Sequence, residues 1–171
     1  MWQVTNLKVG RRHHIRTRRA KELFAKVSKI LKYNFFDTAD TRTRIEVIEL
    51  IPKGELILLN NEAVFIQVEE ELFPTLVNTL SLDELPSVTV DMGAVPYICN
   101  GADVMAPGLV KIDGAFTVGD VLTVVEERFS KPIAVAKALY AAKEVAEKKR
   151  GKIAINLHYV GDAFWEAFKR L

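Results

Sequence analysis

The sequence has a single cysteine, Cys99, so no disulfide bond can form within the chain. No apolar run approaches the roughly 20 residues that a membrane-spanning helix requires. The first residues also lack the apolar core of a signal peptide. These absences argue against a disulfide-stapled scaffold and a membrane-spanning protein. We therefore expect a soluble, cytoplasmic protein that does not associate with a membrane.

Motifs that carry common enzyme chemistry are also absent. Gly151-Lys152 is followed by isoleucine, not by the serine or threonine of a Walker A motif, and neither GxGxxG nor HExxH occurs. One cysteine cannot build a cysteine-rich zinc site, and the adjacent His13 and His14 do not have the spacing of metal ligands. The sequence therefore predicts a non-enzymatic protein with no cofactor and no metal.

Cys99 and His158 are the two side chains that could still support catalysis. A nucleophilic cysteine needs a base and an activating environment, and His158 is a distant candidate for that base. The sequence favours Cys99 as a small, buried or half-buried thiol. It favours His158 as a hydrogen-bonded histidine at the surface or edge of a strand. An enzyme that uses Cys99 is kept as the alternative.

Charge is unevenly distributed along a chain whose net charge is only +2. Residues 1–35 hold ten lysines and arginines against one acidic residue, residues 36–91 carry a net −9, and residues 92–171 carry +2. Such separation creates local electric fields that the net charge conceals. The acidic segment either neutralises the basic one or receives a protein partner.

Five arginines within nine residues form the first candidate binding site. The guanidinium group binds phosphate with two parallel hydrogen bonds, and clusters of cations gain affinity for nucleic acid by counterion release. Nucleic acid is the favoured ligand, and a protein or intramolecular partner and a membrane surface are the alternatives. The arginines are Arg11, Arg12, Arg16, Arg18 and Arg19.

Apolar spacing in the first half predicts a helix followed by three strands. Ala20, Leu23 and Val27 lie on one stripe at helical spacing, with basic residues opposite, and Thr17 is a candidate N-cap. The expected elements are a helix over 17–33, strands over 44–51, 55–59 and 63–68, and a short helix over 73–80. A polar, proline-containing stretch over 81–87 is the candidate domain boundary.

The second half is β-rich and carries at least one helix. The expected strands cover 88–90, 103–105, 119–127, 133–138 and 153–159, with helical turns over 92–98 and a helix over 139–150 that Gly151 ends. We predict an α+β chain of two domains, residues 1–85 and 86–171.

A glycine-bearing stretch, 100–109, is the second candidate site. Glycines separated by small residues let a backbone come close to a ligand and expose N–H groups to it. A tight structural loop between a helix and a strand has the same composition, so the composition alone does not assign a ligand.

The stretch 90–109 resembles the opening of a PUA domain, the module named for pseudouridine synthases and archaeosine transglycosylases. The resemblance lies in Asp91 and Gly93-Ala94 before a helix, and in Gly-Ala-Asp-Val-Met-Ala-Pro-Gly over 101–108. It implies a C-terminal PUA pseudo-β-barrel that binds RNA through this loop. The implied RNA-contacting residues are Gly101, Ala102, Asp103, Val104, Met105, Pro107 and Gly108. We add Lys111 and Lys137 as nearby cations because of their closeness in sequence or on a neighbouring strand.

The wider chain resembles the malignant T-cell amplified sequence family of translation factors and its archaeal counterparts. Phe73-Pro74-Thr75-Leu76 resembles the junction motif of that family, and 155–162 followed by Trp165 resembles its C-terminal strand and tail. Residues 1–50 match only loosely. The resemblance implies a small N-terminal α+β (pre-PUA) domain before the PUA domain.

The same resemblance implies a role in translation initiation, reinitiation or recycling. The implied partners are tRNA or rRNA, the small ribosomal subunit and a second translation factor. Two alternatives stay open. One is an RNA-targeting subunit of an RNA-modification enzyme or a ribosome-biogenesis factor, and the other is a protein-interaction module that does not bind RNA.

Overall fold

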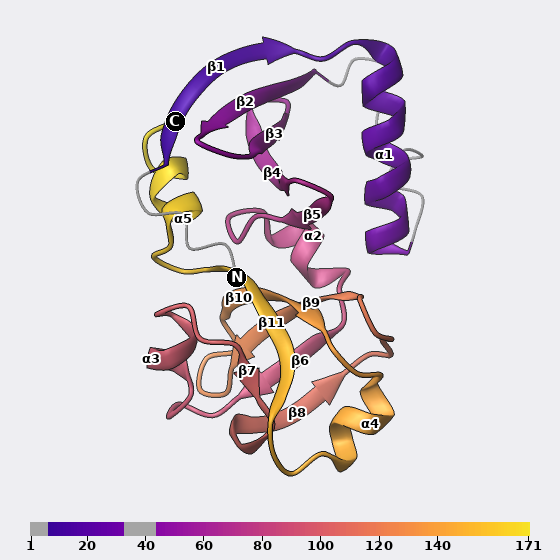
Figure 1. Ribbon diagram of the computed structural model, residues 1–171, viewed down its shortest axis with the longest axis vertical. Helices are drawn as coiled ribbons and strands as arrows, with labels where there is room; N and C mark the ends of the chain where they lie inside the picture. The colour runs from indigo at the N-terminus through magenta and orange to yellow at the C-terminus, as the bar shows by residue number, and fades with distance from the viewer. Residues whose placement is uncertain (1–6, 33–43) are drawn as a thin grey trace.

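The computed structural model describes residues 7–32 and 44–171 and arranges them around two β-sheets (Figure 1). The first six residues, the predicted helix end at Tyr33 and residues 36–43 of the acidic segment lie outside the described residues. The chain contains both helices and sheets, and this confirms the predicted α+β class.

The first sheet has five antiparallel strands in sequence order, and all of them come from the first half of the chain. They are β1 Lys8–His14, β2 Ile45–Ile51, β3 Glu55–Leu59, β4 Glu62–Val68 and β5 Glu71–Pro74. The three predicted strands are confirmed as β2, β3 and β4. Asn60 and Asn61, both with positive φ, form the tight turn between β3 and β4.

The short helix predicted over 73–80 is wrong in its first half. Phe73 pairs with Ile66 of β4, so the start of this segment belongs to the edge strand β5 and not to a helix. Only Thr79–Asp83 is helical, as α2, and the Asn78 side chain caps it by accepting the Ser81 N–H at 3.1 Å.

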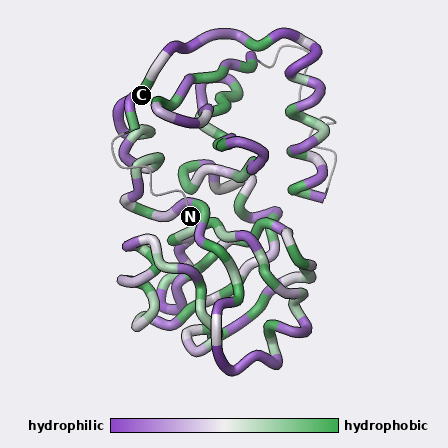
Figure 2. Tube along the Cα trace, in the orientation of Figure 1, coloured by the Kyte–Doolittle hydropathy of each residue, from purple (hydrophilic) through white to green (hydrophobic). Residues whose placement is uncertain are grey.

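Helix α1 spans Thr17–Leu31 and packs through one face, as its periodicity predicted. Ala20, Leu23, Phe24, Val27 and Leu31 are buried. The opposite face is basic, and hydrophilic residues also dominate β1 (Figure 2). The predicted N-cap is wrong by one residue, because Arg16 occupies the cap position without a side-chain hydrogen bond.

The second sheet has six strands in the order β7-β11-β10-β9-β6-β8. Only the β6–β9 pair is parallel. The strands are β6 Ser87–Val90, β7 Val104–Met105, β8 Leu109–Asp113, β9 Val121–Glu126, β10 Pro132–Ala138 and β11 Lys152–Tyr159. Helix α3 (Val95–Ile98) precedes β7, and the 3-10 turn η1 (Ala106–Gly108) follows it. The strands predicted after residue 86 are confirmed, apart from differences of one or two residues at their ends and β8, which was not predicted.

Helix α4 covers only Ala142–Glu147, so the helix predicted over 139–150 is too long. The Glu144 side chain accepts the Ala141 N–H at 3.0 Å and fixes the first turn. Gly151 does not cap this helix. It has φ +84° in the turn that leads into β11, a conformation that glycine adopts without strain.

Two buried clusters hold the fold together, and the first one crosses from one sheet to the other. Helix α5 (Ala163–Phe168), near the C-terminus, packs into the cluster of the first sheet through Phe164 and Ala167. Val121, Val135 and Leu157 of the second sheet join the same cluster. Ion pairs from Lys32 to Asp120 and from Lys137 to Glu71 add polar links at this junction. The division at residues 85 and 86 stays a prediction.

Candidate nucleic-acid interface

The loop over 102–108 forms one wall of a surface groove of about 450 Å³. The turn over 91–94 and helix α3 form the other wall. Most of the lining is apolar. Met105 and Tyr97 belong to this lining and are exposed to solvent. Tyr97 is 70% exposed. An exposed aromatic ring beside a groove lined by small residues suits an unstacked base, because every base has a π-face.

Close contacts between its two walls set the width of the groove. The Asp91 N–H of one wall donates to the Gly108 carbonyl of the other at 2.9 Å, and within the first wall the Asp91 carboxylate accepts the Ala94 N–H at 2.8 Å. A Cβ atom on Gly108 would lie 3.0 Å from the Ala94 Cβ, a tight contact that would require one of the two walls to shift by a few tenths of an ångström. A side chain at this position would push the walls apart.

Asn156 of β11 holds the loop from behind. Its Nδ2 donates to the carbonyls of Ile98 at 3.0 Å and Ala102 at 2.9 Å, and its backbone N–H donates to Asp103 Oδ1 at 2.9 Å. The Asp103 carboxylate also pairs with Lys152. Asp103 therefore directs its charge toward β11, where it positions the loop.

The seven loop residues predicted to contact RNA differ widely in exposure. Met105 and Pro107 are exposed, while Ala102, Asp103 and Gly108 are half-buried. Val104 is buried in the core of the second sheet, and Gly101 is buried against the ring of Tyr159 with φ +88°. These two residues therefore expose almost no surface, backbone included, through which a ligand could contact them.

The sequence prediction missed Tyr97 and the turn that begins at Asp91 as parts of the groove. Both lie directly before the predicted loop, and the fold brings them across from it. The sequence did offer a signal for Tyr97, since this aromatic residue follows a proline in a stretch that can form only a very short helix. Such a helix has no apolar face long enough to bury the ring.

The two added cations lie in different places. Lys111 of β8 pairs with Asp113 at 2.9 Å and lines a second hollow of about 520 Å³, together with Lys148 and Lys149. Pro107 lines both this hollow and the groove, so Lys111 lies beside the predicted loop. Lys137 does not line the groove and pairs with Glu71 at the junction of the sheets.

Three of the five predicted arginines are tied to carboxylates. Arg12 of β1 donates to both carboxylate oxygens of Glu46, at 3.1 and 2.5 Å, and this contact holds the pKa of the Glu46 carboxyl below its usual value. Arg18 pairs with Glu22 at 3.1 Å, and Arg19 pairs with Glu55.

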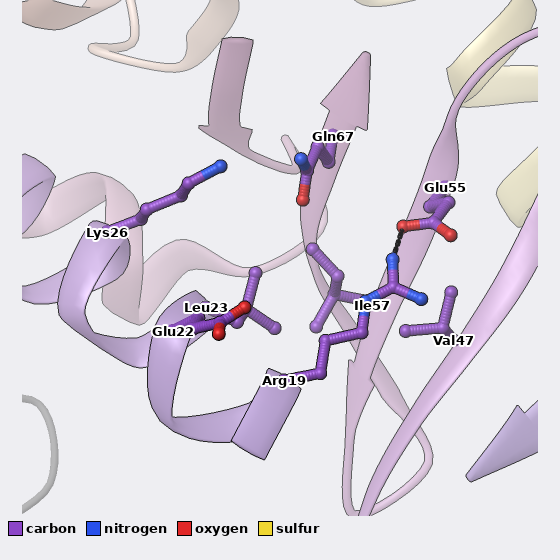
Figure 3. A pocket seen from close by; sticks show the side chains of 8 residues that line it. All are labelled: Arg19, Glu22, Leu23, Lys26, Val47, Glu55, Ile57 and Gln67. Atoms are coloured by element: carbon purple, nitrogen blue, oxygen red, sulfur yellow. Dashed lines mark hydrogen bonds and ion pairs between the residues drawn. The ribbon is translucent and has the colours of Figure 1, made fainter. Parts of the chain in front are cut away.

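Part of the acidic segment therefore neutralises the basic one, since Glu46 and Glu55 both belong to residues 36–91. Arg19 reaches Glu55 across a hollow of about 120 Å³ between α1 and the first sheet (Figure 3). Lys26, about two helical turns further along, points toward Gln67 (Figure 3).

Six cations of this region make no ion pair within residues 7–32 and 44–171, and three of the six lie on helix α1. They are exposed and comprise Lys8, Arg11, Arg16, Lys21, Lys26 and Lys29. Only two of the five predicted arginines belong to this set. Lysines of α1, which the sequence prediction did not select, supply much of the free positive charge.

Cys99 and His158 differ in how far they match their predicted settings. The Cys99 thiol is half-buried as expected, and burial raises its pKa, which disfavours the thiolate. The prediction that His158 lies at a surface or edge is wrong, since its side chain is 0% exposed. Strand β11 lies inside the sheet between β7 and β10, and rings of Phe73, Phe164 and Phe168 surround the imidazole.

The residues that the structure describes form neither a metal-binding cluster nor a membrane-spanning helix. No cluster of three or more histidine, cysteine, aspartate or glutamate side chains in that part of the chain could hold a metal ion. None of the helices within 7–32 and 44–171 has the length and apolar character needed to cross a membrane.

Comparison with known proteins identifies the second sheet. The sequence profile of the PUA domain matches residues 86–160. An uncharacterized protein of Methanocaldococcus jannaschii is 39% identical over 85% of this chain and 92% of its own. Translation machinery-associated protein 20 of Eremothecium gossypii is 25% identical over 84% of this chain and 81% of its own.

A solved structure is similar over both sheets. The crystal structure of a hypothetical protein from Pyrococcus horikoshii superposes with a TM-score of 0.79 and 34% sequence identity. The alignment covers 92% of this chain and 99% of that one, so the pairing of an N-terminal sheet with a PUA domain is shared.

Proposed function

Because the chain belongs to the malignant T-cell amplified sequence family of PUA-domain proteins, we propose that it is a non-enzymatic RNA-binding protein of the translation machinery. The name of the Eremothecium gossypii relative supports a role in the translation machinery, and the PUA match supports RNA as the ligand. The proposed partners are tRNA or rRNA on the small ribosomal subunit, together with a second translation factor in the cytoplasm.

The groove beside Tyr97 is the observation that carries this proposal. Its walls are small side chains and backbone at the PUA motif, with an exposed ring at the rim. Such a site binds without chemistry: a nucleotide that leaves the helical stack enters the groove and its base meets the aromatic ring. A single-stranded 3′ end next to a duplex offers a nucleotide of this kind.

The free cations of β1 and α1 supply the second part of the proposed mechanism. They would bind the phosphate backbone without reading sequence and would steer RNA toward the protein. This contribution falls as salt concentration rises, whereas stacking in the groove depends much less on salt.

The proposal is tested by the anisotropy of a labelled mature tRNA, with and without its 3′ CCA end, at several salt concentrations. Weaker binding after removal of the end supports a groove that reads the unpaired terminus. If both forms of the tRNA bind with equal affinity and a steep salt dependence, the cations alone contact the tRNA. In that case rRNA becomes the preferred ligand of the groove. No binding at low salt contradicts the proposal and favours a protein-interaction module.

Charge removal on α1 gives a prediction about which cations matter. The double change Lys21→Gln and Lys29→Gln should weaken binding to all RNAs alike and reduce the salt slope by about two, because each lysine that neutralises a phosphate contributes close to one. The measurement is the dependence of log Kd on log salt concentration.

The double change Arg18→Gln and Arg19→Gln is the matched control. It removes two charges from the same helix, but these charges are paired with Glu22 and Glu55. Its effect on the salt slope should be the smaller of the two. Equal slopes for both variants would show that the free lysines have no special part in binding.

A further inference from the structure

The turn that joins β9 to β10, residues 127–131, presents an aromatic side chain to solvent. Phe129 at its tip is 63% exposed. The guanidinium carbon of Arg128 lies 5.0 Å from the centre of the ring, and Lys131 Nζ lies 5.8 Å from it. Neither cation makes an ion pair with any residue in the described part of the chain. An exposed ring with two available positive charges is therefore fixed at one point of the surface.

The shape of this turn is set from inside by Glu126. Its buried carboxylate accepts the backbone N–H groups of Arg128 at 2.7 Å, Phe129 at 2.8 Å and Lys131 at 3.1 Å. Burial opposes ionisation, but these hydrogen bonds hold the pKa of Glu126 below its ordinary value. The backbone under the ring is thus ordered before any ligand arrives, which lowers the entropy lost on binding.

The turn is also tied to the groove. The Glu127 N–H donates to the Val90 carbonyl at 3.1 Å, and the Glu127 carboxylate accepts the Met92 N–H at 3.0 Å. Val90 lines the groove, and Met92 lies within the turn over 91–94 that forms part of its wall. The Phe129 ring and the groove therefore lie at the same end of the second sheet.

We propose that the turn over 127–131 is a second nucleotide-binding element, in which Phe129 stacks on the base of an unpaired nucleotide and Arg128 and Lys131 bind the adjacent phosphates. The nucleotide is a neighbour of the one held in the groove, so this inference rests on the proposed RNA-binding function. A nucleic acid explains the cations better than a protein partner does, because lysine is depleted at the centres of protein interfaces.

Substitutions of the exposed ring test the proposal without disturbing the core. Phe129→Leu keeps apolar surface but removes the ring, and Phe129→Tyr keeps the ring. The probe is a single-stranded oligoadenylate that carries one 2-aminopurine, whose fluorescence falls when it stacks. Phe129→Leu should weaken binding roughly tenfold and reduce the quenching, as expected for the loss of one stacked base. Phe129→Tyr should retain both the affinity and the quenching.

Val118→Ala is the matched control. Val118 is 65% exposed and precedes Gly119, whose N–H donates to the carbonyl of Ala138 at the far end of β10 from the turn. It should bind the probe as the unchanged protein does. Affinity and quenching in Phe129→Leu that equal those of the unchanged protein would overturn the stacking element.

Labelled tRNA separates failure of this inference from failure of the proposed function. If the unchanged protein and Phe129→Leu bind the tRNA with equal affinity, and quenching of the oligoadenylate is also equal, the stacking element is wrong and RNA binding stands. If the unchanged protein binds neither RNA at low salt, both proposals are wrong.

Discussion

Replacement of Asn156 by leucine should weaken RNA binding more than tenfold and lower the free energy of unfolding by about 3 kcal/mol. The change keeps most of the side-chain volume but removes the two N–H donors that Asn156 directs at the carbonyls of Ile98 and Ala102. The Ala102 carbonyl then loses this donor, and the Ile98 carbonyl keeps the Gly101 N–H at 3.0 Å as its remaining donor. The wall of the groove loses its fixed position, although Asn156 itself is only 4% exposed and lies behind the loop.

Lys152→Gln provides the comparison for Asn156→Leu. Lys152 pairs with Asp103 in the same loop, but its side chain is partly exposed, so we expect its loss to cost less than 1 kcal/mol. Urea unfolding gives the stability of both variants, and tRNA anisotropy at a temperature where both are folded gives their affinity. Normal affinity in folded Asn156→Leu would mean that the groove is not the RNA site.

A second large loss of stability, again about 3 kcal/mol, is expected for His158→Ala. The imidazole fills space between Phe73, Phe164 and Phe168, and the variant leaves a cavity there. It also removes the contact of 2.7 Å between Nδ1 and the Asp162 carboxylate. Asp162 caps α5 by accepting the Trp165 N–H at 2.7 Å, so the helix loses part of its anchor.

The His158→Phe variant separates packing from hydrogen bonding. Nε2 of His158 has no hydrogen-bond partner among the residues that the structure describes, so a phenyl ring suits that side of the site. Phenylalanine still breaks the contact with Asp162, and we expect a loss smaller than that of alanine. Chemical denaturation of the full chain measures both. Stability of His158→Ala within 1 kcal/mol of the unchanged protein would contradict the role assigned to this ring.

Periodicity predicted those elements whose burial follows a regular spacing. Helix α1 carries its buried residues at helical spacing, whereas β2, β3 and β4 are short runs rich in apolar residues, and the structure confirms all four elements. Strand β1 was missed because its side chains are mostly charged or exposed and it is held by backbone pairing with β2. The residues of β1 alone cannot show that this segment pairs with β2, which lies more than 30 residues further along the chain.

The candidate site was predictable in position but not in orientation. The loop motif located one wall of the groove, whereas Tyr97 and Asp91 join it only through the fold. Asp103 was expected to face RNA, yet its carboxylate contacts β11. The pairing of Arg12 with Glu46 and of Arg19 with Glu55 likewise depends on contacts between distant segments, so the sequence could not show which arginines are free.

The packing of α5 has a consequence for the way the chain folds as it is synthesised. The ribosome makes the first sheet early, but Phe164 and Ala167, which complete its core, emerge near the end. N-terminal segments usually fold before later ones leave the exit tunnel. Here the first sheet keeps apolar surface uncovered until the PUA strands have been translated. The part of the protein that is made first is therefore finished last, and a nascent chain that stalls before Phe164 would present this surface to chaperones.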